Sequence, residues 1–334
     1  MKKVLIWLAP LLIAASFSCK KSDGNNGVGG TGKGTGSIYF HDTNEGIFKM
    51  DVRTGKKTQV LPYDVSRYYW DVSRDGKKIL ETSDPDDPNN RNYDLYKIRD
   101  ANSGAVLSSF KWYSGYANAT RPIFSPDGAM IAITAPYNGK IFIVDTQGNA
   151  LYNIYATSGS FTGNLQWMPD NTLLFTINKT LYRSNTTFSD FRRIASFNNF
   201  NMISQLAANN AGTSLVFMGA MPGDDNAHLW MINTDGSGLK QITQGNETEG
   251  APAFSPDGAL LAFGSDLIQS VGVPWTIGGS GQGIALGSSV WGISIMPADG
   301  NTYNVENNNA VFHFPQQGKR NNRVPADSDP MEWR

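Results

Sequence analysis

Histidines are the side chains that most often carry acid–base or metal chemistry near neutral pH, and the chain has His41, His228 and His313. No two of them have the short spacing of a metal-binding pair, and each follows, begins or lies within a short apolar run. The chain has no HExxH or CxxC motif, and no Gly-x-Ser-x-Gly turn leads into a helical pattern. We therefore predict that these histidines belong to strands, that there are no catalytic residues, and that the protein is not an enzyme.

Three further segments contain residue types found in ligand-binding motifs but lack the spacing or the sequence context of those motifs. The run Gly27–Gly34 nearly spells a phosphate-binding loop, but Gly34 stands where that loop needs Ser or Thr. The glycines of Gly278–Gly283 lack the strand and helix that surround a dinucleotide-binding motif. The acidic run Asp84–Asn90 can offer oxygen ligands to Ca²⁺, but it lacks the spacing of an EF-hand and contains two prolines. We expect no cofactor and no bound metal, and a solvated loop at Asp84–Asn90.

The one cysteine, Cys19, is a candidate for covalent modification. Lys2 and Lys3 precede an apolar stretch, Val4–Phe17, which is short for a membrane span and has the build of a cleavable signal. A cysteine at the cleavage point resembles a lipoprotein signal, in which that residue receives the lipid. Ser16 replaces the usual Leu, a looser pattern that resembles lipoproteins of the Bacteroidetes. The alternative is a plain secretory signal with an incidental cysteine.

The segment after Cys19 is predicted to be a tether. Residues 20–36 are almost entirely Gly, Asn, Ser, Thr and Lys, which cannot bury enough apolar surface to fold. A flexible segment of this length reaches roughly 20–25 Å. We predict a signal peptide at 1–18, a lipidated cysteine and tether at 19–36, and one domain at 37–334. A single cysteine allows no intramolecular disulfide, so the stability of that domain must come from its core.

The composition excludes one class of partner and favours one class of fold. The chain has 334 residues, of which 40% are hydrophobic, and a formal net charge of −1. The sequence has no excess of Lys and Arg that could neutralise the phosphates of a nucleic acid, so we expect no nucleic-acid partner. The 35 glycines and the many Asn and Asp residues indicate many turns. Many short strands are therefore favoured over a few long helices.

A repeated motif predicts how those strands are organised. In Pro122–Gly128 and Pro252–Gly258 a short apolar strand meets a Ser-Pro-Asp-Gly turn, and a second apolar strand leaves it. Proline sets φ at the turn entry, Asp can accept bonds from nearby backbone N–H groups, and glycine tolerates positive φ. Looser copies lie at Ser73–Gly76, Trp167–Asn171 and Asn209–Gly212. A third and a fourth strand follow each copy, so the repeating unit is a four-stranded antiparallel sheet.

The Phe-Ser-Pro-Asp-Gly motif resembles the PD40/WD40-like repeat of TolB-like propellers, and also that of prolyl oligopeptidase propellers. The resemblance implies an all-β fold, a six-bladed β-propeller with four-stranded antiparallel blades. Blades two to six begin near Arg67, Arg121, Asn164, Met202 and Ala251. Blade one takes the strands that start at Ser37. Its innermost strand is expected from the C-terminal run Asp329–Trp333, which closes the ring and removes a free sheet edge.

The face that carries the blade-to-blade connections is the predicted binding face. The largest insertion, Gly264–Ser289, lies between the second and third strands of blade six and is either a functional lid or docking loop or merely a flexible segment. Aromatic side chains gather on the same face, and they offer stiff contact area with a polar handle. The predicted site residues are Tyr63, Tyr68, Tyr69, Trp112, Tyr113, Tyr116, Tyr137 and Trp275. The alternative is that some of them pack between blades as core.

Two functions remain open from the sequence. The first, implied by the resemblance to TolB, is a non-enzymatic binding protein that docks a protein or peptide of the cell envelope. The second is a protein that binds or processes a polysaccharide. A ring of carboxylates in the central channel would favour the second, and an apolar or plugged channel the first. In both cases we expect a monomeric outer-membrane lipoprotein, attached by its lipid and facing the periplasm or the exterior.

Overall fold

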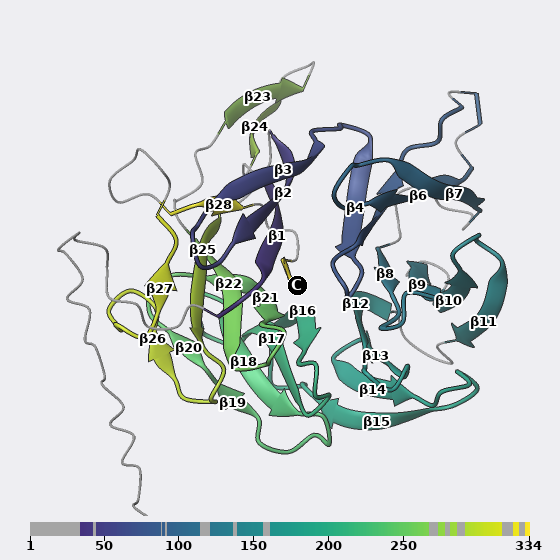
Figure 1. The fold of residues 1–334 in the computed structure, drawn as a ribbon. Helices are drawn as coiled ribbons and strands as arrows, with labels where there is room; N and C mark the ends of the chain where they lie inside the picture. Colours follow the sequence, from purple (N-terminus) through teal and green to yellow (C-terminus); the bar gives the residue numbers. More distant parts are fainter. Residues whose placement is uncertain are drawn as a thin grey trace, which may run out of the picture. The chain divides into compact units, whose positions relative to one another are not determined.

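The computed structural model describes residues 34–42, 45–87, 89–90, 92–113, 121–135, 139–155, 161–266, 273–277, 281–285, 291–315, 323–326 and 331–334. These residues form strands and turns, without an α-helix. In this part of the chain there is consequently no long apolar helix of the kind that crosses a bilayer. The strands group into six antiparallel blades that follow one another in chain order around a ring (Figure 1).

The first three blades are regular four-stranded sheets. Blade one comprises β29 (Glu332–Trp333), β1 (Ser37–Asp42), β2 (Gly46–Asp51) and β3 (Lys57–Pro62). Blade two comprises β4 (Arg67–Val72), β5 (Lys78–Ser83), β6 (Asp94–Asp100) and β7 (Val106–Trp112). Blade three comprises β8 (Pro122–Phe124), β9 (Met130–Ala135), β10 (Lys140–Asp145) and β11 (Ala150–Tyr155). In each blade the first strand named is the innermost.

The remaining blades follow the same order, with additions in blade six. Blade four comprises β12 (Phe161–Trp167), β13 (Leu173–Ile177), β14 (Thr180–Ser184) and β15 (Phe191–Ser196). Blade five comprises β16 (Met202–Ala208), β17 (Ser214–Ala220), β18 (His228–Asn233) and β19 (Lys240–Gln241). Blade six comprises β21 (Glu249–Phe254), β22 (Leu260–Asp266), β25 (Trp291–Pro297), and β27 (Phe312–His313) with β28 (Pro325–Ala326), both paired to β25. A short parallel pair, β20 (Thr243–Gln244) and β26 (Tyr303–Asn304), joins blades five and six.

The turn between the first two strands of a blade is held by its own side chains. In blade three the Ser125 hydroxyl donates to Asp127 Oδ1 (2.6 Å), and the same oxygen accepts the N–H of Ala129 (3.0 Å). Gly128 has a φ of 68°, which a residue with a Cβ adopts only with strain. Blade six repeats these distances, with Ser255 donating to Asp257 at 2.6 Å. These local bonds explain why the motif recurs at the same place in the blades.

The ring closes as the sequence predicts. Strand β29 pairs antiparallel with β1, with Trp333 opposite Ile38 and Glu332 opposite Tyr39. Trp333 is 1% exposed, and its indole N–H donates to the carbonyl oxygen of Thr35 (2.8 Å). Residues from the two ends of the domain therefore share one blade, and the prediction of a six-bladed propeller closed by its C-terminal strand is confirmed.

Among the described residues, the hydrophobic core divides into clusters that each join two neighbouring blades. Between blades two and three, for example, Leu80 and Tyr96 pack with Ile131 and Ile133. Equivalent clusters link each of the other neighbouring pairs, including blade six with blade one. Because every blade is buried on both of its flanks, the blades hold each other at fixed angles around the channel.

The insertion in blade six has an element that was not predicted. It lies between β22 and β25, as expected, but it contains a hairpin of β23 (Val273–Ile277) and β24 (Gly281–Ala285). This hairpin was not identified from the sequence. Its many glycines obscured the short alternating run in β23, which is a weak signal for a strand in isolation.

Candidate binding site at the central channel

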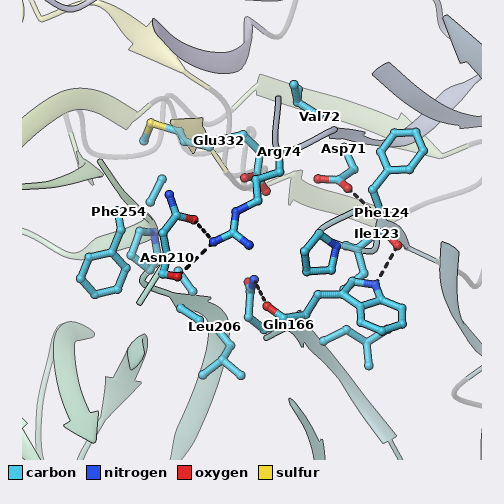
Figure 2. A pocket seen from close by; sticks show the side chains of 18 of the residues that line it. Asp71, Val72, Arg74, Ile123, Phe124, Gln166, Leu206, Asn210, Phe254 and Glu332 are labelled. Carbon is cyan, nitrogen blue, oxygen red and sulfur yellow. Dashed lines mark hydrogen bonds between the residues drawn. The ribbon is translucent and has the colours of Figure 1, made fainter. Parts of the chain in front are cut away.

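The innermost strands of the blades enclose a cavity that opens between the turns following those strands. The cavity volume open to the centre of a water molecule is about 90 Å³, so the cavity is narrow below its open mouth. Residues from β4, β8, β12, β16, β21 and β29 line it, together with the turn residues Arg74, Pro126, Pro169 and Asn210 (Figure 2). We call this opening the channel mouth. It lies on the face of the turns that lead from the first to the second strands, opposite the blade-to-blade connections that the sequence predicted as the binding face.

One ring of side chains occupies equivalent positions in the innermost strands. Each stands two residues before the turn or, in blade one, before Arg334: Asp71, Ile123, Gln166, Ala207, Ala253 and Glu332. Two of these side chains are carboxyl groups, and they come from the neighbouring blades two and one. The channel is therefore neither lined by a ring of carboxylates nor purely apolar.

The inward-facing edges of the innermost strands are largely capped by side chains from a neighbouring blade. The Asp71 carboxylate of blade two accepts the N–H of Phe124 in blade three (2.7 Å), and Trp167 of blade four donates to the carbonyl oxygen of Ile123 (3.1 Å). Gln205 of blade five accepts the N–H of Ala251 in blade six (2.6 Å). An innermost strand has an unpaired edge, so these bonds satisfy backbone groups that no strand can reach.

Register shifts reshape the innermost strands of blades two, four, five and six, and those of blades five and six contain a residue at positive φ. The register of β16 shifts between Ser204 and Ala207, and that of β21 shifts between Gly250 and Ala253. Within the bulges Gln205 has a φ of 54° and Ala251 a φ of 50°. Positive φ at residues with a Cβ is strained, and such strain clusters at binding and active sites. The bulges turn backbone N–H groups toward the neighbouring blade, where side-chain oxygens accept them.

The carboxyl pair has an unusual electrostatic setting. Burial, and then the nearby charge of Glu332, raise the pKa of Asp71 to about 7, although the Phe124 N–H and nearby arginines oppose the shift. Glu332 is held by the Arg334 guanidinium, with 2.6 Å between Nη2 and Oε2. One carboxyl group therefore titrates near neutral pH while the other has a cationic partner.

Arginines dominate the charge of the channel mouth. Arg74 leaves the turn of blade two and donates through Nη2 to the carbonyl oxygen of Asn210 (3.1 Å) and to its side-chain Oδ1 (2.7 Å). Blades two and five stand opposite each other in a ring of six, so this bond spans the mouth (Figure 2). Arg334 donates to the carbonyl oxygen of Val72 (3.2 Å), and Arg121 lines the same cavity. The Nε of Arg121 is buried and has no hydrogen-bond partner among the described residues.

The predicted aromatic site residues that the structure describes lie at the other end of the innermost strands and along the blades. Tyr63 is 51% exposed and lines a shallow groove between blades one and two. Tyr68 and Tyr69 are half-buried in β4. Trp112 packs edge-on against Phe142 (5.1 Å between centroids), so it belongs partly to the core. Tyr113 is 61% exposed and rests against Tyr93 (5.4 Å).

These aromatic residues rest against different neighbours, and none of the described ones lines the channel mouth. Tyr116, Tyr137, the side chain of Trp275 and the lipidation candidate Cys19 lie outside the described residues. The aromatic face therefore remains a prediction from the sequence.

The histidines have structural partners. His228 Nδ1 bonds the buried carboxylate of Glu249 (2.8 Å), which also accepts the hydroxyl of Thr243 (2.7 Å). The bond to Glu249 raises the pKa of His228, whereas burial raises the pKa of Glu249 itself. His313 bonds Ser294 Oγ (2.7 Å) and the carbonyl oxygen of Val305 (3.1 Å), and burial lowers its pKa. In the part of the chain described here, no group of His, Cys, Asp and Glu side chains is arranged to hold a metal ion.

In the acidic loop that was considered for calcium, the Asp86 carboxylate already has a cationic partner. Lys111 Nζ lies 3.1 Å from Asp86 Oδ1, and the Tyr93 hydroxyl donates to the same oxygen. A lysine in this position occupies the negative charge that a calcium ion would need.

The channel mouth was missed at the level of sequence, although one signal pointed to it. The second position of the turn is proline in blades three, four and six (Pro126, Pro169 and Pro256). Blades two and five carry Arg74 and Asn210 instead, and these two residues bond across the mouth. Where a residue departs from the repeat at a position that the other blades share, the departure indicates a role other than forming the turn.

Comparisons with known proteins support the fold. No family model matches the chain, and no curated protein matches it. Among solved structures, TolB from Acinetobacter baumannii matches with a TM-score of 0.60 and 19% identity, over 90% of this chain and 67% of that one. A protein described as TolB from Agrobacterium tumefaciens matches with a TM-score of 0.56 and 17% identity, over 90% and 94%. Hydrazine synthase from Kuenenia stuttgartiensis matches with a TM-score of 0.53 and 15% identity, over 80% and 70%.

At these identities the likeness concerns the fold alone. The chain has the architecture of a TolB-like six-bladed β-propeller, and the resemblance predicted from the Ser-Pro-Asp-Gly repeat is confirmed at that level.

Proposed function

We propose that this chain is a non-enzymatic binding protein of the cell envelope that docks a protein or peptide partner at the channel mouth. The observation that carries the proposal is the cavity itself, which all six blades line and which combines apolar walls with a few charged side chains. The likeness to TolB implies an envelope protein as partner. Exposed aromatic residues such as Tyr63 and Tyr113 are a second proposed contact surface.

The polarity of the cavity favours binding over catalysis. Arg74, Arg121 and Arg334 project from three blades, whereas the carboxyl groups are Asp71 and Glu332. Asp71 is 4% exposed and its Oδ2 accepts the Phe124 N–H, so it holds two blades together. Fixed donors around an apolar wall suit recognition of an extended segment.

The alternative, a protein that binds or processes a polysaccharide, has one observation in its favour. Glycosidases place a carboxyl group with a raised pKa near a second carboxylate, and Asp71 with Glu332 has that character. A screen of polysaccharide depolymerisation tests it. Activity that disappears in Asp71→Asn, while circular dichroism shows that the variant is folded, would replace the binding function by this one.

Site-specific photo-crosslinking in cells tests the docking function. A benzophenone amino acid at Ala211, which is exposed beside Asn210, is compared with the same group at Leu107, which is exposed on the outer strand β7. We expect one protein captured at the Ala211 position and absent at the Leu107 position, identified by mass spectrometry. The purified partner should then bind the purified propeller. Equal capture at both positions, or at Leu107 alone, would rule out docking at the channel mouth.

The cell-envelope location is part of the proposal and is supported by the sequence of the N-terminal region. A positive and apolar segment ends at Cys19, and the Gly- and Asn-rich residues 20–36 follow. A lipid at Cys19 would hold the propeller near a membrane, where envelope partners are available.

A further inference from the structure

We propose that the channel mouth recognises side-chain carboxylates of an extended acidic peptide, and that such a carboxylate displaces Asn210 from the Arg74 guanidinium. This inference rests on the proposed docking function and specifies its ligand. It is argued from the bond that spans the mouth, from the charges that line it, and from the side chains that are absent from its described lining.

The bond between Arg74 and Asn210 is a link across a cavity rather than a link within a blade. Arg74 Nη2 reaches two oxygens of Asn210, and Asn210 Nδ2 in turn donates to the carbonyl oxygen of Pro256 in blade six (2.8 Å). Both residues replace the proline found at this turn position in other blades. The link joins turn residues at the channel mouth, so it places the Arg74 cation where an entering segment can contact it.

The oxygens that hold Arg74 are neutral. A guanidinium bonds a carboxylate with two parallel charge-assisted hydrogen bonds, which are about twice as strong as bonds between neutral groups. Burial and the charge of Arg334 lower the pKa of Arg74, which shows that its cation is partly desolvated and lies near a like charge. A carboxylate at this position would relieve that repulsion, whereas the amide of Asn210 cannot. An acidic group therefore competes well for Arg74.

The other charges of the lining act in the same direction. Arg121 lines the cavity with a buried Nε that has no partner among the described residues, so it has a hydrogen bond to offer. Arg334 is already shared between Glu332 and the carbonyl oxygen of Val72. With its pKa near 7, Asp71 carries only part of a negative charge at neutral pH. The lining is consequently positive on balance.

Aspartates in the turns around the mouth do not line the cavity, and partners of their own offset part of their negative charge. Each is bound within its own turn, and most have a second partner. Asp75 also contacts Lys77, Asp127 accepts Asn171, and Asp170 accepts Arg183 (2.6 Å). Asp257 accepts Ser255 and Ala259. They are a polar rim around a positive opening.

The lining favours a peptide over an acidic sugar. Sugar rings pack on exposed aromatic faces, but the aromatic residues that line the cavity in the described structure are Phe124, Trp167 and Phe254, each at most 7% exposed. The lining residues Leu206 and Ala208 are partly exposed and offer small and aliphatic walls instead. Such walls accept the backbone and short side chains of an extended chain.

Fluorescence anisotropy with a defined probe tests the inference. The probe is a labelled peptide of alternating alanine and aspartate with both ends blocked. One control peptide has asparagine in place of aspartate, and another has the asparagine sequence with a free C-terminal carboxylate. We expect the wild-type propeller to bind the aspartate peptide at least about tenfold more tightly than either control.

Variants of the link separate recognition from folding. Asn210→Asp places an internal carboxylate on Arg74 and should weaken binding of the aspartate peptide about tenfold, whereas Asn210→Ala frees Arg74 and should strengthen it a few-fold. Arg74→Gln should abolish binding. Arg192→Gln is the matched control, because Arg192 is exposed on the outer strand β15 and should leave binding unchanged. Circular dichroism confirms that each variant is folded.

Several results would overturn the inference. Equal affinities of Asn210→Asp and Asn210→Ala would show that Arg74 is not the contact. Binding of the free C-terminal control alone, binding of an oligogalacturonate in place of every peptide, or no binding at all would exclude acidic side chains as the ligand. The docking function fails separately, if crosslinking at Ala211 captures no more than crosslinking at Leu107.

Discussion

At the scale of single residues, the hydrogen bond of Asp71 favours its charged form, whereas its burial disfavours that form. Its carboxylate caps the Phe124 N–H and so links blades two and three. The same group is buried near Glu332, which raises its pKa to about 7. A cap that is charged pairs better with an N–H, but a charge at this depth is disfavoured by desolvation and by its neighbour. An uncharged acceptor at this position would avoid the cost of the buried charge.

We therefore predict a pH-dependent effect of Asp71→Asn on stability. The folded-state pKa lies above the unfolded value of 3.8, so the folded protein binds more protons, and wild-type stability falls as pH rises from about 4 to about 7. Asparagine can still accept the Phe124 N–H but does not ionise. The free energy of unfolding of the variant should therefore rise relative to that of the wild type across this pH range, by on the order of 2–4 kcal/mol in total. Above pH 7 the difference should stay constant.

Urea unfolding at a series of pH values measures that effect. Asp127→Asn is the matched control, because hydrogen bonds within its turn lower the pKa of Asp127, so its loss should destabilise the protein above pH 4. A difference between Asp71→Asn and the wild type that does not vary between pH 4 and pH 7 would contradict the raised pKa.

At the scale of strands, the two-residue pairing of β29 with β1 closes the ring. Trp333 is almost fully buried in the cluster that joins blades six and one, among Ile38, Ile293 and Val324. Removing such a side chain leaves a cavity where both flanks of a blade need support. A loss at this point therefore loosens the interface between blades six and one, where the ring closes.

We predict that Trp333→Ala lowers the free energy of unfolding by about 3–5 kcal/mol, and that deletion of residues 331–334 lowers it further. Thermal unfolding followed by circular dichroism measures both variants. Leu107→Ala serves as control, since Leu107 is 56% exposed and its loss should change stability by less than about 0.5 kcal/mol. A truncated chain with an unaltered melting temperature would show that the ring does not depend on β29.

The strands and the site differ in how far the sequence could predict them. The bonds that hold a turn, such as those of Ser125 and Asp127, join residues at most five positions apart. Because such bonds depend on local sequence, the blades could be recognised from their repeated turn motif. The carboxyl pair depends on the register of β29 on β1, which brings Glu332 to the position equivalent to Asp71. Bulges at Gln205 and Ala251 shift register in ways that no spacing reveals. The pairing of Arg74 with Asn210 required knowing that blades two and five face each other.

At the scale of the whole molecule, we propose that the rigid ring serves binding and that a tether, expected from the sequence of residues 20–36, serves placement. The propeller supplies a fixed arrangement of donors at the channel mouth, which needs no ordering when a ligand arrives. Residues 20–36 have the composition of a linker, with a reach of roughly 20–25 Å. A tether of this kind would let the channel mouth turn toward a partner while the chain stays at the membrane.

We predict that Cys19→Ala moves the protein from the membrane fraction to the soluble fraction, because the alanine variant cannot receive a lipid and a single apolar signal is removed on export. Fractionation followed by immunoblotting measures the shift. Ser16→Ala is the matched control, since it keeps the cysteine and should stay with the membrane. The purified domain of both variants should melt at the same temperature, because Cys19 lies outside the propeller blades. If Cys19→Ala remains in the membrane fraction after a high-salt wash, a lipid at this residue does not hold the protein there, and the envelope partner would have to do so instead.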